Sequence, residues 1–176
     1  MDIPACVCVP TCVPTCTPTC TPTCIPTCIP TFIPAHPQVT LDGCHDCRLL
    51  VGPVDGALMM RQCTSLQISA VCRQLRCRDC ADCTLRLFTQ GPIIESSVRM
   101  SFGPWNAAYP RLASHLAKAG LTPTDAQPNQ WAAVHDFNEP HVPAGAAPSN
   151  WRCLPEAAFA DSWQVTPPAP LSLPQL

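Results

Sequence analysis

Hydrophobic and polar positions alternate along the stretch CRQLRCRDC, which runs from Cys72 to Cys80. Leu75 and Cys77 are apolar, whereas the positions beside them are polar. A period of two residues predicts a β-strand with one buried face and one solvent-exposed face. The exposed face presents a glutamine and two arginines, Gln74, Arg76 and Arg78. A rigid row of guanidinium groups can bind carboxylates or phosphates, and the alternative is a merely solvated strand face.

A longer repeat spans residues 39–103, where small or apolar residues recur at steps of 17 to 19 residues. Its columns are Cys44, Cys63, Cys80 and Ser97; Cys47, Leu66, Cys83 and Met100; Leu49, Ile68, Leu85 and Phe102; and Met60, Cys77 and Ile94. A fixed period of this length is typical of stacked coils. Turn residues at Gly52-Pro53, Asp55-Gly56 and Gly91-Pro92 mark the corners. The pattern predicts an all-β fold, a parallel β-helix of about three coils.

Two Cys-x-x-Cys pairs, Cys44/Cys47 and Cys80/Cys83, resemble zinc half-sites. The repeat places them two coils apart, about 9 to 10 Å at the usual strand spacing, whereas thiolates that share a zinc ion lie about 2.3 Å from it. The coil between them offers Leu66 in one of the two columns, and leucine is no ligand. We therefore predict no metal and no cofactor. Instead, buried thiols fill the narrow interior, at positions Cys44, Cys47, Cys63, Cys80 and Cys83.

The same step places Arg61, Arg78 and Glu95 in one outward column. Neighbours in such a column are about 4.8 Å apart, so we expect Arg78 and Glu95 to be adjacent and Arg76 to reach Glu95 diagonally. A carboxylate here could hold a guanidinium in a set rotamer. As a surface ion pair it would contribute only about 0–1 kcal/mol.

The two ends are rich in proline, of which the 176 residues contain 23. In residues 1–37 the unit x-Pro-Thr-Cys repeats every four residues, which excludes helix and sheet alike. We expect residues 1–38 to be a low-complexity extended coil, and we expect residues 1–37 to contribute nothing to folding. Thiol-rich metal capture, palmitoylation and a gene-model artefact are the alternatives. Residues 166–176 are expected to be disordered, which leaves one domain at 39–165.

Between Pro110 and Gly120 the sequence predicts a helix of about ten residues. Its apolar stripe is Leu112, Leu116 and Ala119. We expect this stripe to cap the β-helix. Scattered aromatic residues follow and are expected to pack on the coils as an irregular segment. His135 beside Asp136 could suggest catalysis, but no nucleophile elbow accompanies the pair, so we interpret His135 as a packing residue.

Composition narrows the classes of partner. The formal net charge is −2, so no strong field favours nucleic acid or an anionic membrane. The sequence has no run of about 18 apolar residues and no basic-then-apolar leader. We therefore expect neither a membrane span nor a secretory signal, and we expect reduced thiols. Asp2 excludes N-myristoylation for this start.

Several segments in one order resemble the cofactor-C-like (C-CAP) domain family, shared by tubulin-folding cofactor C and the retinitis pigmentosa 2 protein, and most nearly the latter. They are DGCHDCRLLVGPVDG, CRQLRCRDC, GPIIESS followed by Phe102, YPRLASHLAKAGL, VHDF and NWRCLPE. The resemblance covers about residues 39–160 and implies a right-handed parallel β-helix. It also implies GTPase activation, in which the domain presses an arginine into the active site of a small GTPase.

By this resemblance Arg76 matches the family's finger arginine and Gln74 its companion glutamine. Glu95 matches a carboxylate that supports the finger, and Phe137 matches a residue that packs against an Arf-like GTPase. Arg73, where the nearest relative has another glutamine, and Arg78 would complete the partner interface. The relative's lipidated start, its coils before residue 39 and its nucleoside-diphosphate-kinase-like domain have no counterpart here, which makes membrane attachment doubtful.

The resemblance implies a GTPase-activating protein for an Arf-like GTPase in ciliary or membrane protein trafficking. It would act in the cytoplasm, at the cilium or basal body, or at the cytoplasmic face of the plasma membrane. One alternative is a tubulin-folding factor that acts on tubulin, and another is a non-catalytic scaffold or truncated paralogue. Because the sequence has no Walker A motif, GTP and Mg²⁺ would belong to the partner, and the chain would have no complete active site of its own.

Overall fold

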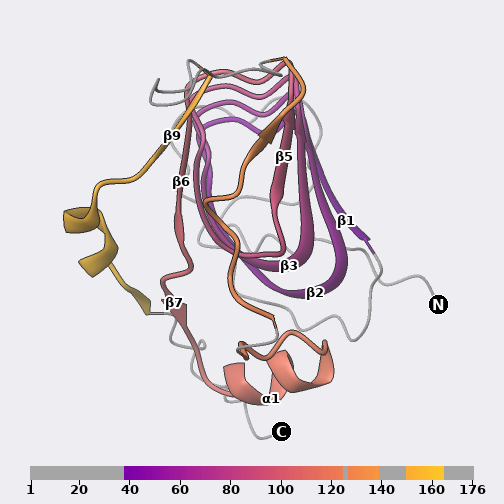
Figure 1. Cartoon of the computed structure of the whole chain (residues 1–176), viewed down its shortest axis with the longest axis vertical. Helices are drawn as coiled ribbons and strands as arrows, with labels where there is room; N and C mark the ends of the chain where they lie inside the picture. The colour runs from indigo at the N-terminus through magenta and orange to yellow at the C-terminus, as the bar shows by residue number, and fades with distance from the viewer. Residues whose placement is uncertain (1–37, 125–126, 139–149, 165–176) are drawn as a thin grey trace, which may run out of the picture.

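The computed structural model describes residues 38–124, 127–138 and 150–164, whose strands stack into a parallel β-solenoid (Figure 1). The strands are β1 (Gln38–Asp42), β2 (Arg48–Arg61), β3 (Gln67–Arg78), β4 (Thr84–Phe88), β5 (Pro92–Glu95), β6 (Met100–Pro104), β7 (Ala107–Ala108), β8 (His135–Asp136), β9 (Trp151–Cys153) and β10 (Trp163–Gln164). The helices are α1 (Leu112–Lys118) and the 3-10 helix η1 (Glu156–Ala160). The proline repeat of residues 1–37 and the tail at 166–176 lie outside the described residues.

The apolar columns read from the sequence are stacked in register, which confirms the parallel β-helix. Leu49, Ile68, Leu85 and Phe102 are successive partners from β2 to β6. All four side chains are at most 4% exposed. Such a column exists because a strand's side chains alternate between faces, and in-register parallel pairing stacks each inward residue on its equivalent.

Two kinds of corner separate the sides of each coil. At the rounded lower end of Figure 1, β2 and β3 bend without ending. The register of β2 against β3 shifts between Val51 and Val54 and again between Val54 and Ala57. The predicted corners at Gly52-Pro53 and Asp55-Gly56 are therefore bends inside one strand, since bulges turn the chain there. At Gly91, by contrast, φ is +143° and the chain turns before β5.

The tight corners lie at the opposite end and consist of residues in the left-handed conformation, three positions apart. These are Gly43 and Asp46, Gln62 and Ser65, Asp79 and Asp82, and Ser96 and Arg99. Bridges align the four corners through His45, Thr64, Ala81 and Val98. The solenoid therefore has about four turns, one more than the sequence suggested. Gln62 and Arg99 are not typical turn-forming residues, which made the second and fourth corners difficult to recognise from the sequence.

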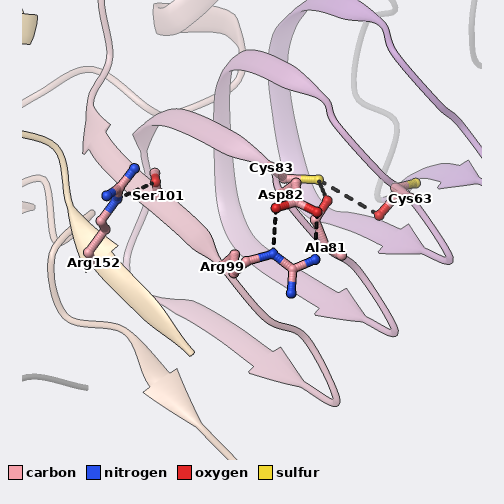
Figure 2. A network of polar contacts seen from close by, with 7 residues as sticks. All are labelled: Cys63, Ala81, Asp82, Cys83, Arg99, Ser101 and Arg152. Atoms are coloured by element: carbon pink, nitrogen blue, oxygen red, sulfur yellow. Dashed lines mark hydrogen bonds and ion pairs between the residues drawn. The ribbon is translucent and has the colours of Figure 1, made fainter. Parts of the chain in front are cut away.

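Figure 2 shows how the tight corners are held together. The guanidinium of Arg99 donates two hydrogen bonds of 2.6 Å to the carboxylate of Asp82, one coil earlier. These bonds hold the pKa of Asp82 below its ordinary value. In the interior, the Cys83 thiol donates to the carbonyl oxygen of Ala81 at 3.2 Å. The corner at Asp79 and Asp82 is thus fixed by a polar contact within its own coil and by one from the next coil.

Helix α1 is seven residues long, not ten, and it covers the rounded bend rather than the end of the solenoid (Figure 1). Leu116 and Ala119 pack against Val71 and Phe88 in this position. The end of the solenoid is covered by the segments after α1, where β8 pairs with β5 and β9 pairs with β6. Three side chains there pack against the core, namely Trp131, Val134 and Trp151.

His115 is the buried residue of α1, and its Nδ1 lies 3.2 Å from the hydroxyl of Tyr109. Burial lowers the pKa of His115 from its ordinary 6.5, with smaller contributions from the nearby charges of Arg111 and Lys118. The unfolded chain therefore binds a proton at His115 more readily than the folded chain does. The contribution of this residue to stability is complete above about pH 6.5 and decreases as the pH falls below it.

We expect thermal unfolding to show this dependence. Between pH 7.5 and pH 5.5 the wild-type midpoint should fall more than that of His115→Gln, which cannot titrate in this range. If the thermal midpoints of the two proteins fell equally over this pH range, protonation of His115 would not affect stability and the prediction would be wrong.

Candidate functional site

The exposed face of β3 presents the arginine row predicted from the sequence. Leu75 and Cys77 are buried, Arg76 and Arg78 are exposed, and Gln74 is half-buried. The alternation is therefore confirmed. The pleat of the strand determines which side chains point inward and which point outward. Pairing with β2 along one edge and with β5 along the other holds this part of β3 in the sheet.

Arg76 lies in the middle of an outward column that crosses five strands. Its register partners are Met59 on β2 and Ile93 on β5, and the column runs from Thr40 on β1 to His135 on β8. Met59 and Ile93 are half-buried apolar residues. Within the described residues, Arg76 makes neither an ion pair nor a side-chain hydrogen bond. The guanidinium therefore has an apolar residue beside it on each adjacent strand, and no acceptor for it is found in the described part of the chain.

The apolar neighbours of Arg76 were missed by the sequence analysis, although the signal was available. Met59, Arg76 and Ile93 are separated by the same 17-residue step as the other columns. The column was not recognised because it places a charged residue between two apolar ones, whereas the recognised columns contain only small or apolar residues.

Glu95 is the register partner of Arg78, as predicted, but the expected ion pair is not formed. Arg78 Nε instead lies 3.5 Å from Oδ2 of Asp79. Asp79 is adjacent in the chain and adopts the left-handed conformation of the corner, with φ 54°, which brings its carboxylate within reach. In the described part of the chain Glu95 pairs with neither Arg78 nor Arg76. Its supporting role for the finger remains a prediction about the complex.

Phe137 follows β8 directly and extends the same face. Its N–H donates to the carbonyl oxygen of Ile94 at 3.0 Å, which places it beside the end of β5. The side chain is 60% exposed, and its ring contacts that of His135 edge-to-face at 4.8 Å. An aromatic side chain this exposed is a common anchor in protein interfaces.

His135 is exposed, so the interpretation as a packing histidine is wrong. The adjacent Asp136 points inward, is 6% exposed and accepts hydrogen bonds from the N–H of Asn138 and from Nδ2 of Asn150. Neighbouring strand residues face opposite sides of the sheet. The two side chains therefore cannot act as a catalytic pair, and Asp136 has a structural role.

Arg73 does not extend the exposed arginine row. Its Nε donates to the carbonyl oxygen of Asp55 at 3.0 Å, and its Nη2 lies 2.5 Å from Oδ1 of the same residue. Arg73 and Gln74 both line a recess of about 430 Å³ in the surface. Of the sequence-predicted site residues, Gln74, Arg76, Arg78, Glu95 and Phe137 share one face, and Arg73 sits at its margin.

The cysteines of the tight corners share one bonding pattern. Each thiol donates to the carbonyl oxygen two residues earlier, at distances from 2.9 to 3.6 Å, in Cys44, Cys47, Cys63, Cys80 and Cys83. Burial raises the pKa of the Cys83 thiol to about 11, which keeps this thiol protonated at neutral pH.

Cys44 and Cys47 are only half-buried, so the prediction that all five thiols are buried is wrong for these two. They lie in the corner between β1 and β2, in the first described coil. This corner is bridged to the next coil through His45 and Thr64, and no described coil stacks on its other side.

We expect the corner thiols to hold no zinc. Leu66 separates Cys47 from Cys83 in their column, and the described residues contain no group of three or more potential ligands arranged around a metal position. Incubation with a chelator should therefore leave the thermal midpoint unchanged within about 1 °C, where loss of a structural zinc would unfold the domain. Stoichiometric zinc in the purified protein, released together with the fold, would contradict this.

No helix among the described residues is long and apolar enough to cross a membrane.

Among solved structures, the chain is similar to tubulin binding cofactor C from Leishmania major, with a TM-score of 0.63 and 23% sequence identity over 81% of this chain and 94% of that one. This likeness supports the fold.

Among curated proteins, the chain is 31% identical to human tubulin-specific chaperone C over 120 residues, which are 68% of this chain and 33% of that protein. It is 44% identical to protein XRP2 of Danio rerio over 89 residues, 49% of this chain and 21% of that protein. The chain thus spans a third or less of these relatives. The family model described as tubulin binding cofactor C matches residues 26–137. The chain therefore belongs to the tubulin binding cofactor C family.

Proposed function

We propose that this chain is a GTPase-activating module that supplies Arg76 to the active site of an Arf-like small GTPase. The observation that carries the proposal is the position of Arg76: it is exposed in the middle of a sheet face and has no side-chain partner among the residues that the structure describes. An arginine held in this way is available to a charged group on another molecule. Its planar fork of donors matches phosphate oxygens.

The chemistry would be electrostatic. As the γ-phosphoryl group is transferred, negative charge spreads over its oxygens, and an arginine inserted from outside stabilises that charge. Met59 and Ile93 beside Arg76 would exclude water from the guanidinium once a partner covers this face, which strengthens the interaction. Gln74, two residues earlier, and Phe137, next to β5, would orient the partner around it.

Tubulin is a second candidate partner, and one observation favours it. The matching family model and the longest of the two sequence matches above are both named for tubulin. Tubulin also hydrolyses GTP, so the same arginine could act on it. In either case the proposed location is the cytoplasm.

The test is a GTP hydrolysis assay with a panel of Arf-like GTPases and with αβ-tubulin, each at saturating concentrations of this chain. We expect stimulation of one of the two classes, of the order of 10³–10⁵ in rate for a complete arginine finger. Binding of a partner without any stimulation would instead favour a scaffold in which the arginines only bind carboxylates.

A further inference from the structure

We propose that Cys44 and Cys63 form a peroxide-reactive thiol pair, in which hydrogen peroxide converts the two thiols into a disulfide between the first and second described coils. Both residues lie in the tight corners, at the opposite end of the coils from the rounded bend (Figure 1). The inference does not depend on the proposed function, because both side chains belong to corners and not to the outward face of β3. It assigns a modification site to cysteines that otherwise only fill space.

The backbone stacks Cys44 directly on Cys63. His45 and Thr64 are bridge partners, and the N–H of Thr64 donates to the carbonyl oxygen of Cys44 at 2.9 Å. Since each cysteine precedes its bridge residue, the two lie side by side on neighbouring coils, about 4.8 Å apart at the usual strand spacing. The Cα atoms of disulfide-linked cysteines are about 4.4–6.8 Å apart. A disulfide can therefore close between them with little movement of the backbone.

The sulfur atoms follow the same stack. The thiols of Cys44 and Cys80 lie within hydrogen-bonding reach of the Cys63 sulfur, one coil before it and one coil after it, and these contacts lower the pKa of Cys63. The contact with Cys63 in turn raises the pKa of Cys80, which stays protonated. In Figure 2 the thiol of Cys83 approaches the carbonyl oxygen of Cys63 and not its sulfur. A lowered pKa increases the thiolate fraction of Cys63, and the thiolate is the nucleophilic form.

Access distinguishes the thiols of this stack. Cys44 is half-buried, whereas Cys63 and Cys80 are at most 1% exposed. A molecule as small as hydrogen peroxide therefore meets Cys44 first. The corner of Cys44 is also held by a described coil on one side only, while that of Cys63 is bridged on both sides. The edge corner can therefore adjust its position as the bond forms.

The reaction consumes one hydrogen peroxide in two steps. The Cys44 thiolate attacks a peroxide oxygen and the O–O bond breaks. The departing hydroxide takes up the proton that the thiol has lost, which gives a sulfenic acid and water. The Cys63 thiolate then attacks the Cys44 sulfur and displaces hydroxide, which becomes water with the proton from Cys63. Two electrons pass from the sulfur atoms to the peroxide, so Cys44 is the reacting thiol and Cys63 the resolving one.

The disulfide would fasten the edge coil to the rest of the solenoid. It would join two residues that are 19 positions apart in the chain, and a crosslink of this kind stabilises chiefly by restricting the unfolded chain. We expect the thermal midpoint of the oxidised protein to rise by several degrees. Reduction with dithiothreitol should return the midpoint to its original value.

Peptide mapping of the full chain identifies the bond. Reduced protein is treated with hydrogen peroxide, the remaining thiols are alkylated, and the species that runs as a single chain on a non-reducing gel is cleaved before aspartate and after arginine. This cleavage places Cys44 in fragment 42–45, Cys47 in 46–48 and Cys63 in 62–73. Fragmentation in the mass spectrometer separates Cys63 from Cys72. We expect fragment 42–45 to be linked to Cys63 in more than half of this species, and the link to be lost with dithiothreitol.

Cys47→Ser is the matched control. Cys47 is also half-buried and lies in the same corner, but the residue stacked beside it in the next coil is Leu66, which has no thiol. This variant should keep both the disulfide and the rise in the thermal midpoint. Cys44→Ser and Cys63→Ala should lose both. Circular dichroism before oxidation verifies that each variant is folded, and Cys44→Ser, at the half-buried position, keeps the test valid if Cys63→Ala does not fold.

The position of the bond decides the proposal. A bond from Cys44 to Cys47, from Cys63 to Cys80, or from Cys44 to a cysteine of residues 1–37 would overturn it. Oxidation of Cys44 to sulfinic acid without any disulfide would overturn it as well, because Cys63 would then not resolve the sulfenic acid. A bond from Cys44 to Cys63 that left the thermal midpoint unchanged would contradict the fastening of the edge coil. None of these measurements involves GTP or a partner, so their outcome is separate from that of the hydrolysis assay.

Discussion

Arg76→Ala is expected to reduce the maximal stimulated rate of GTP hydrolysis by about 10³–10⁵-fold, equivalent to roughly 4–7 kcal/mol of transition-state stabilisation. Affinity for the GTPase should change little, because a contact made mainly in the transition state appears in the rate rather than in binding. The fold should be unaffected. Arg76 is exposed between the inward Leu75 and Cys77, so its removal opens no cavity, and surface changes of this kind usually alter stability by under about 0.5 kcal/mol.

Two neighbouring substitutions sharpen the prediction. Arg76→Lys should fail almost as badly as Arg76→Ala, because an ammonium group lacks the planar fork of donors. Arg78→Ala should cost much less, since Arg78 already interacts with Asp79 and lies one outward position further along the strand. Stimulation by Arg76→Ala within a few-fold of wild type, at saturating protein and with binding verified, would exclude the arginine-finger mechanism.

Phe102→Ala is expected to destabilise the domain by about 3–5 kcal/mol, a large part of the 5–15 kcal/mol typical of a folded domain. Phe102 is fully buried, stacks on Leu85 in the core column and contacts Trp151 edge-to-face at 6.1 Å. Its removal leaves a cavity between the last full coil and the covering strand β9. Urea denaturation measures the change, which should appear as a lower midpoint at unchanged slope.

Phe137→Ala is the matched control for this prediction. The same side chain is removed, but Phe137 is 60% exposed, so the free energy of unfolding should stay within about 0.5 kcal/mol of wild type. Loss of affinity for the GTPase is the expected effect there, because the ring would be buried only in the complex. Equal destabilisation by the two substitutions would mean that Phe102 does not lie in the core or that Phe137 is part of it.

Much of this fold could be predicted because the sequence patterns that determine it are local and repeat along the chain. The two-residue alternation fixes which side of a strand each residue faces, and the 17-residue step fixes which residues stack. Together they place Arg76 outward between Leu75 and Cys77 and set Glu95 beside Arg78. The course of the bend was less predictable, because Gly52-Pro53 and Asp55-Gly56 allow both a turn between strands and a bulge within one.

Side-chain pairing was the least predictable part of the site. The sequence offered Glu95 as the partner of Arg78, yet Asp79 takes that place, since a left-handed residue at the corner redirects its carboxylate. Arg73 and Asp55, 18 residues apart, meet across the interrupted register of β2. Such contacts depend on backbone details of one or two residues, which no periodicity encodes.

Two arginines differ in a way that the sequence does not determine and the tertiary structure does. Arg76 and Arg86 both lie on strands, each between two buried apolar residues, so the sequence alone assigns both to outward positions. Only the tertiary structure distinguishes them. Arg86 is 6% exposed, because η1 and the residues after it lie over it and accept its hydrogen bonds at Ala158 and Asp161. The face around Arg76 is left uncovered in the described structure. The alternation of a strand determines direction, but coverage depends on segments more than 70 residues away in the chain.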